Sequence, residues 1–350
     1  MKYKTICFTL SLLFILATGG ILIGQNNNQL QKALKVKEEP VKEMKQSITL
    51  SVAGDVTLGN YHGSSYYGSF NHEVKQQQNN YSYFLDGVNS VFENDDLSIV
   101  NLEGPLTVAQ NPKIKQFAFK GNPEYVNILT EGDIEAVSIS NNHSEDYFEQ
   151  GTEDTKSTLN NSNIKYFGMG EKSILEVKGI KIGSLGYNGW PENYNEEYLD
   201  GIKKDIENLK KEADSILVYF HWGSENSYYP NEIQKNFAHD AIDLGADIVI
   251  GSHPHVVQGI EKYKDKYIAY SLGNFCFGGN KNPRDKDSFI YQQTLDFEGG
   301  KLVSINEPKV IPVSISSSNN RNDYKPVVLE GEDKERIINK VKNISENLNK

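Results

Sequence analysis

The stretch Asp247–Gly259, DIVIGSHPHVVQG, organises the interpretation of this sequence. A short apolar run leads into a small-residue break and then into His253 and His255, with Pro254 between them. Alternate side chains of an extended segment share one face, so an H-x-H pair can direct two imidazoles at one point, which suits a metal site. Pro254 lacks a backbone donor and has a fixed φ, so we expect the pair on a stiff turn. On this stretch alone, a turn with two exposed histidines remains the alternative.

The composition predicts a folded, acidic protein. The chain has 350 residues, of which 37% are hydrophobic and 24% charged, enough for one large domain or two ordinary ones. A formal net charge of -11 argues against non-specific nucleic-acid binding, and it would repel a polyanionic substrate unless a metal or a basic patch intervened. Cys7 and Cys276 are far apart in the sequence, so we expect no internal disulfide.

The N-terminus predicts a membrane-targeting segment. Residues 1–23 place Lys2 and Lys4 before an apolar run, which fits an uncleaved signal-anchor at the cell membrane, with the C-terminal domain outside. A cleaved signal peptide and a secreted product are the alternative. Residues 24–46 are polar and indicate a solvated tether. Residues 47–315 form the predicted domain, and residues 316–350 a charged C-terminal tail or helix.

From residue 47 onward, strand, loop and helix patterns alternate, which predicts an α/β fold with parallel strands. Expected strands cover residues 48–53, 97–100, 136–140, 181–185, 215–220 and 267–272. Expected helices cover residues 83–92, 122–131, 151–160, 231–244 and a segment from about 201. Residues 60–80, rich in Tyr, Gly, Asn and Gln, indicate a surface loop, and residues 288–313 alternate as antiparallel strands do.

Polar residues follow the C-terminal ends of these apolar runs. In open α/β sheets, ligands bind in the crevice at such ends, so five strands would deliver polar groups to one edge. Taken singly, each has an ordinary structural explanation, such as a helix cap, a turn or a packed histidine. Their conjunction predicts a shared site of Asp55, Glu103, Asn142, His143, His221, His253 and His255.

The chemistry of this set indicates divalent metal ions. Its donors are oxygen and nitrogen with no thiolate, which suits Mn, Fe, Zn, Co or Mg and argues against a structural zinc knot. One carboxylate can bridge two ions about 3.5–4 Å apart, an arrangement that drives in-line displacement at phosphorus. An imidazole just outside the ligand set can protonate the leaving oxygen.

Six sequence blocks carry a family resemblance. They are GDVTLG at 54–59, NLEGPLT at 101–107, SNNHSEDY at 140–147, HWGSE at 221–225, GSHPHVVQG at 251–259 and SLGNFCF at 271–277. Together they resemble the CapA family of poly-γ-glutamate capsule synthesis proteins, within the calcineurin-like metallophosphoesterase superfamily, over roughly residues 47–315. The resemblance implies a four-layer α/β/β/α sandwich with two metal ions at the strand ends.

The resemblance also implies a role for each site residue. Asp55, Asn142 and His221 would be metal ligands, Glu103 the bridging carboxylate and His143 the general acid. His253 and His255 would contribute one ligand to each metal. Asp146, Glu225 and Asn274 are weaker candidates for supporting or substrate contacts, and each has a turn, cap or exposed-surface alternative. Lys120 and Arg284 could neutralise an acidic substrate or lie on the solvated surface.

The function implied is participation in poly-γ-glutamate synthesis or export. Partners would be membrane subunits of the poly-γ-glutamate synthase, with an anionic polymer or a phosphoester as the substrate. A phosphoesterase unrelated to capsule and a non-catalytic binding protein are the alternatives. Two departures from the wider superfamily bear on this choice: Thr57 replaces the histidine of its usual D-x-H block, and Glu103 replaces an aspartate.

Overall fold

The computed structural model describes residues 45–348. The segment 1–23, predicted to target the membrane, lies outside the described residues, as does nearly all of the predicted tether. Within residues 45–348, no helix is both long enough and apolar enough to cross a membrane.

A nine-stranded sheet is centred on β1 (Lys45–Thr57). On one side of β1 the strands run parallel to it: β3 (Leu97–Leu102), β5 (Ala136–Ser138) and β6 (Lys165–Phe167). On the other side follow β14 (Asp287–Glu298), β16 (Lys309–Ser314) and β17 (Val327–Val328), each antiparallel to the strand before it, as residues 288–313 predicted. Two further strands pair with this sheet: β13 (Asn274–Phe277) and β15 (Lys301–Ile305).

A second sheet of six strands has four parallel members at its centre. These are β8 (Ile180–Gly189), β9 (Ser215–Trp222), β10 (Ile248–Ser252) and β12 (Lys266–Ala269). Its antiparallel edges are β7 (Lys172–Val177) and β11 (Ile260–Tyr263). The short strands β2 (Asn60–Tyr61) and β4 (Phe119–Lys120) pair separately.

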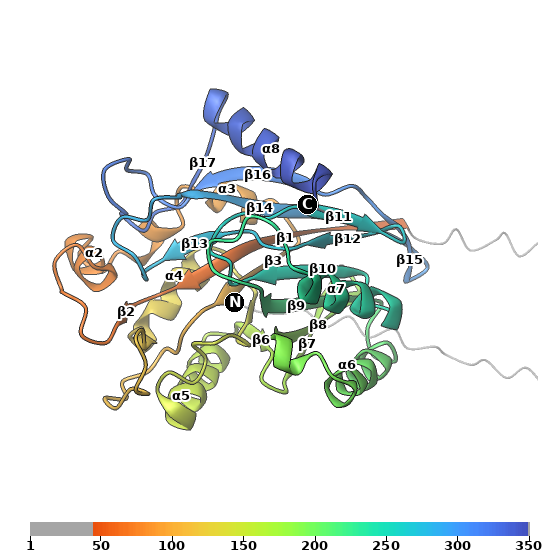
Figure 1. Cartoon of the computed structure of the whole chain (residues 1–350), viewed down its shortest axis with the longest axis horizontal. Coiled ribbons are helices and arrows are strands. Elements are labelled where there is room, and N and C mark those ends of the chain that lie inside the picture. Colours follow the sequence, from red (N-terminus) through yellow and green to blue (C-terminus); the bar gives the residue numbers. More distant parts are fainter. Residues whose placement is uncertain (1–44, 349–350) are drawn as a thin grey trace, which may run out of the picture. The chain divides into compact units, whose positions relative to one another are not determined.

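The two sheets pack on each other, and helices cover their outer faces (Figure 1). In β9, Leu217 and Tyr219 face the core between the sheets, while Val218 and Phe220 face α6 (Glu196–Leu209) and α7 (Glu232–Leu244). The first sheet is covered by α2 (Phe70–Gln76), α3 (Asn89–Phe92), α4 (Val126–Glu131) and α5 (Phe148–Asn161). The predicted α/β class is confirmed.

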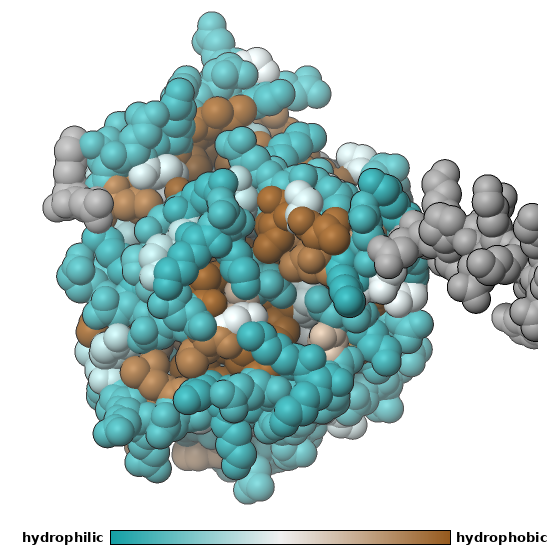
Figure 2. Space-filling view, turned by 90° about the vertical axis from the view of Figure 1, so that its right-hand side faces the viewer, coloured by the Kyte–Doolittle hydropathy of each residue, from teal (hydrophilic) through white to brown (hydrophobic). Residues whose placement is uncertain are grey.

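The last helix, α8 (Gly331–Glu346), adds Ile337, Val341 and Ile344 to the core between the sheets. Its Arg336 forms two hydrogen bonds with Asp287 of β14, at 2.7 and 2.8 Å. On the face shown in Figure 2, hydrophilic side chains predominate and hydrophobic ones form separate patches.

Local signals explain where α7 begins and ends. Asn231 accepts a hydrogen bond from the backbone of Gln234, whose side chain in turn bonds the backbone of Asn231, forming a capping box. Gly245 ends the helix with φ 117°, a left-handed conformation that favours glycine. The helix predicted over residues 231–244 is therefore confirmed.

Two predictions in the first half are wrong. Residues 60–80 are not only a loop, because they contain α2, whose Phe70 and Val74 are buried. The helix expected over 83–92 is broken into a 3-10 turn (Tyr81–Phe84) and α3. The break comes at Gly87, where a Cβ atom would lie only 2.5 Å from the carbonyl oxygen of Pro326, so the chain turns there to make room for β17.

Candidate metal centre

The first sheet supplies carboxylates from two neighbouring parallel strands. Asp55 lies near the end of β1, not after it as predicted, because the strand continues through a register shift between Val52 and Asp55. Glu103 directly follows β3. Both side chains are buried, with exposed fractions of 0% and 1%. The parallel arrangement therefore brings two carboxylates to one edge of the sheet.

The second sheet supplies imidazoles. His221 is the penultimate residue of β9, whereas the prediction placed it after the strand. His253 and His255 follow β10 and both have left-handed φ angles, 95° and 57°. The pair lies on a bend after the strand, and it is not extended. Left-handed non-glycine residues of this kind cost energy and cluster at functional sites.

These residues form two groups that share Glu103. In one group, ligand atoms of Glu103, His221 and His253 lie within 4.8 Å of one another; in the other, those of Asp55, Glu103 and His255 do. Donor atoms around one tetrahedral ion with bonds near 2.1 Å lie about 3.4 Å apart. The observed separations are close to this: 3.1 Å from His221 Nε2 to His253 Nδ1, and 3.3 Å from His255 Nδ1 to Asp55 Oδ2.

One atom at the centre of the site lacks a hydrogen-bond partner. Among residues 45–348, Glu103 Oε1 is a buried oxygen that accepts no hydrogen bond, although it lies 3.7 Å from Nε2 of His221 and 3.7 Å from Nε2 of His255. Its other oxygen accepts from the Thr57 hydroxyl at 3.3 Å. A buried carboxylate oxygen that faces imidazoles without a partner is what a bridging metal ligand requires, so these residues fit divalent cations.

In the group of Glu103, His221 and His253, the electrostatics favour a bound cation as well. Burial raises the pKa of Glu103 to about 8, against the opposing effect of His255. Burial and the neighbouring imidazoles lower the pKa of His221 well below its usual value and that of His253 to about 4. Neutral imidazoles offer lone pairs to a metal, and a buried carboxylate is stabilised by positive charge.

Asn142 and His143 lie in the turn after β5, beside these groups. Asn142 Oδ1 lies 2.8 Å from His221 Nε2, so its amide oxygen adjoins the first group. His143 Nδ1 lies 2.6 Å from Asp146 Oδ2, and its Nε2 lies 4.0 Å from Glu103 Oε1. The edge of Phe119 packs against the imidazole at a ring distance of 4.6 Å. His143 is thus held on one side and directs Nε2 toward the shared carboxylate.

A pocket of about 580 Å³ opens onto this centre. It is lined by His143, His255 and Asn274 of the centre and by the aromatic residues Phe117 and Phe119. The pocket can therefore admit a substrate to the side of the centre where His143 lies.

The region that holds this centre is similar in sequence to known proteins. The sequence matches the family described as "Bacterial capsule synthesis protein PGA_cap" over residues 49–279, which include both ligand groups. A protein of Bacillus subtilis (strain 168), "PGA biosynthesis protein CapA", is 31% identical over 288 residues, covering 75% of this chain and 75% of that protein. This chain belongs to the PGA_cap family.

Two further proteins are also similar to this chain in sequence. "Capsule biosynthesis protein CapA" of Bacillus anthracis is 29% identical over 304 residues, which are 79% of this chain and 70% of the relative. A "Probable polyglutamine synthesis accessory protein" of Mycobacterium tuberculosis is 26% identical over 263 residues, 65% of this chain and 68% of the relative. The family predicted from the six sequence blocks is confirmed.

The weaker candidates differ in where they lie. Asn274 Oδ1 lies 2.8 Å from His255 Nδ1, so this residue contacts the centre. Glu225 is exposed on the pocket wall and makes no hydrogen bond to His221 within the described part of the chain. Arg284 is exposed and lines the same pocket. Lys120 points elsewhere, donating to the Ala109 carbonyl.

Three residues of the centre were missed by the sequence analysis. Asn101 donates to Asp55 Oδ1 at 2.8 Å, and Ser252 Oγ lies 2.9 Å from His221 Nδ1. Asn101 could have been found, because it precedes Glu103 by two residues in a strand and so shares its face. Lys115, whose Nζ is 2.7 Å from Asp146 Oδ1, stands in a loop and gives no such signal.

Proposed function

We propose that this chain is a metal-dependent hydrolase of the calcineurin-like metallophosphoesterase type, acting in the synthesis or export of capsular poly-γ-glutamate. The observation that carries the chemistry is the unpartnered Oε1 of Glu103, shared by two ligand groups. The proposed biological role rests on two relatives that are named as capsule or PGA biosynthesis proteins. The two packed sheets with outer helices agree with the four-layer fold of that superfamily.

The ligand set would hold two divalent ions. Glu103, His221, His253 and Asn142 would hold one, and Asp55, Glu103, His255 and Asn274 the other. When bound, the ions supply the Lewis acidity that activates water and stabilises negative charge during hydrolysis.

The protein's own residues would then complete the reaction. His143 lines the pocket and directs Nδ1–H to Asp146, so in the imidazolium form its Nε2 carries a second proton that it can give to the leaving oxygen, which leaves the ring neutral. The aromatic wall excludes water from one side of the substrate. Arg284, which also lines the pocket, would contact an anionic group of the substrate and offset the repulsion of the acidic body.

The cellular setting is part of the proposal. Residues 1–23 would anchor the chain in the cell membrane with the folded domain outside, and membrane subunits of the polymer synthase would be its partners. An alternative is a non-catalytic role in polymer assembly. Thr57 favours it, because this hydroxyl contacts Glu103 where the wider superfamily has another imidazole ligand.

The test combines metal content with turnover of bis-p-nitrophenyl phosphate in the presence of Mn²⁺. We expect about two ions per chain, and turnover that His143→Ala abolishes without loss of metal. His239→Ala is the matched control, since that imidazole pairs with Glu261 and stacks on Tyr263 away from the ligand groups. Full metal occupancy without turnover would favour the assembly role, and equal turnover by His143→Ala would refute the proton-donor role of His143.

A further inference from the structure

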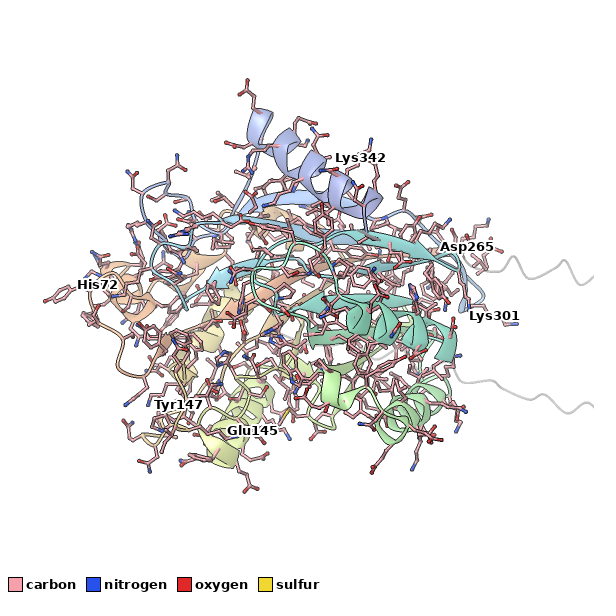
Figure 3. The ribbon with its side chains drawn as sticks, viewed as in Figure 1. His72, Glu145, Tyr147, Asp265, Lys301 and Lys342 are labelled. Carbon is pink, nitrogen blue, oxygen red and sulfur yellow. The ribbon has the colours of Figure 1, made fainter. Side chains whose placement is uncertain are left out.

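Residues 107–118 form an irregular loop in the connection between β3 and β4, and this loop contacts the turn that carries His143. Its Lys113 backbone N–H donates to the Asp146 carbonyl at 2.7 Å. Just beyond the loop, Phe119 N–H donates to Asp146 Oδ2 at 2.6 Å. Figure 3 labels Glu145 and Tyr147, the neighbours of Asp146, beside the start of α5. The loop therefore docks on the one segment that presents the predicted proton donor.

Asp146 is the point at which loop and turn meet. Its side chain is 1% exposed, and both oxygens are engaged. Oδ2 receives the Phe119 N–H and lies 2.6 Å from His143 Nδ1, while Oδ1 lies 2.7 Å from Lys115 Nζ. Among the described residues, Lys115 is the only lysine or arginine within ion-pair distance of this carboxylate.

The charge of Lys115 is what makes this burial tolerable. A buried carboxylate without a cation is strongly destabilising, and removing one partner of a buried pair leaves the other uncompensated. Lys115 Nζ also donates to the Asn142 carbonyl oxygen at 3.0 Å. One ammonium group thus fixes both the carboxylate that holds His143 and the backbone next to it.

Lys115 and His143 do not compete with each other for a hydrogen bond. Nζ lies 3.3 Å from His143 Nδ1, but Nδ1–H is directed to Asp146 Oδ2 and Nζ donates to Oδ1, so the two donors bond different oxygens of one carboxylate. Lys115 does not line the substrate pocket, whereas His143 does. Any effect of Lys115 on the reaction is therefore indirect, through Asp146 and His143 or through the backbone of Asn142, and metal content distinguishes the two routes.

We propose that Lys115 is a positioning residue that holds Asp146, and through it the His143 imidazole, in the orientation required for proton transfer. The inference rests on the proposed role of His143 and extends the centre to a loop outside both sheets. Partners that orient site residues from outside the ligand shell commonly change activity by about 10–100-fold. We expect a loss of this size in kcat on removing the ammonium group.

The experiment uses the full chain with Lys115→Met, Lys115→Arg and Lys113→Met. Lys113 is the matched control, because its side chain pairs with the exposed Glu145 on the same loop. Three quantities are measured: metal content, turnover of bis-p-nitrophenyl phosphate with Mn²⁺, and the downfield proton resonance of His143 Nδ1–H. That resonance is assigned by its absence in His143→Gln.

For Lys115→Met we expect unchanged metal content, kcat lowered about 10–100-fold with KM within about twofold, and loss of the Nδ1 proton through faster exchange. Lys115→Arg retains most of the turnover and the resonance, and Lys113→Met retains both. Should Lys115→Met fail to fold, Lys115→Gln, which keeps a donor but not the charge, is expected to lose turnover and resonance in the same direction.

Two outcomes would overturn the inference. One is a Lys115→Met variant whose resonance and turnover equal those of Lys113→Met. The other is loss of metal from Lys115→Met, which would place Lys115 in the metal site through Asn142 instead. If the wild type itself shows no turnover, the proposed function fails, and the resonance still decides whether Lys115 positions His143.

Discussion

The shared carboxylate makes Glu103→Gln the most informative perturbation of this centre. The substitution keeps the size of the side chain and removes one negative charge from both ligand groups. In the presence of metal we expect the variant to be less stable than the wild type. After chelation we expect the order to reverse, because the wild type then buries an oxygen that accepts no hydrogen bond.

The loss of stability in the presence of metal can be calculated, because metal binding to the folded state adds to the free energy of unfolding. Residues that merely support a ligand change metal affinity by about 10–100-fold, so loss of a shared ligand should cost at least about 100-fold for each ion. At a metal concentration of 100 Kd, binding stabilises the wild type by about 2.7 kcal/mol. A Kd that is 100-fold weaker leaves about 0.4 kcal/mol, a loss of about 2.3 kcal/mol per ion.

The chelated protein adds a pH dependence of known sign. Burial raises the pKa of Glu103 to about 8, so its contribution to stability is lost as the pH rises from 4.5 through 8. Burial alone would lower the pKa of His255. The charges of Glu103 and Asp55 outweigh burial and raise this pKa from 6.5 to about 10. Its contribution is present below pH 6.5 and is lost as the pH rises toward 10.

Between pH 6.5 and 8 the two groups therefore act in the same direction. His221 and His253 have lowered pKa values, so their contribution to the pH dependence arises mainly below pH 6.5 and is small toward the alkaline end of this window. The chelated wild type should lose stability across it. Glu103→Gln removes the titrating carboxyl group and also one of the charges that raise the pKa of His255. The stability of the variant should therefore depend less on pH.

The assay is thermal unfolding at both ends of this pH window, with EDTA and with Mn²⁺. Glu335→Gln is the matched control, because this exposed acid of α8 lies outside both ligand groups. The reasoning is refuted if Mn²⁺ stabilises Glu103→Gln as much as the wild type. It is also refuted if the chelated wild type is as stable as the variant at the alkaline end of the window.

Other substitutions test separate parts of the structure. His253→Gln should remove one of two metal-binding events in a calorimetric titration, because His253 belongs to only one ligand group. Arg284→Met should raise KM for an anionic substrate by roughly tenfold and leave kcat unchanged, since one charge-assisted contact is lost. Asp287→Asn should lower the free energy of unfolding in urea by about 1–2 kcal/mol, because the carboxylate loses its hydrogen bonds to Arg336 of α8. Burial would raise the pKa of Asp287, but its hydrogen bonds and ion pairs with Arg336 and Lys340 lower it. The difference in unfolding free energy between the wild type and Asp287→Asn should therefore vanish as the pH falls below 3.8 through the folded pKa.

The fold could be predicted where a local pattern and its end signals agreed. Residues 231–244 combine helical periodicity with a capping asparagine before them and Gly245 after them, and α7 forms there. Residues 60–80 failed because their polar composition hid the helix. Phe70 and Val74 are four residues apart and pack into the core, but a single apolar pair among Asn and Gln residues gives no measurable period.

The sequence predicted which residues lie at the centre better than it predicted their conformation. Parallel strands present their C-terminal ends at one edge, so residues after separate strands were expected to meet, and they do. The conformation of the H-x-H turn could not be derived from that rule. His253 and His255 adopt left-handed φ angles and point into different ligand groups, which an extended pair would not do.

Lys115 shows where strand-end reasoning stops. The ligands are fixed by backbone register, because neighbouring strands determine which residues lie opposite each other. His143 is different: its orientation depends on Asp146, which is held by a loop whose path no register specifies. Substitutions in residues 107–118 should therefore alter turnover while leaving metal binding intact, whereas changes at the strand ends should affect both. Metal affinity and proton transfer would then be separable properties of one centre, set by different parts of the chain.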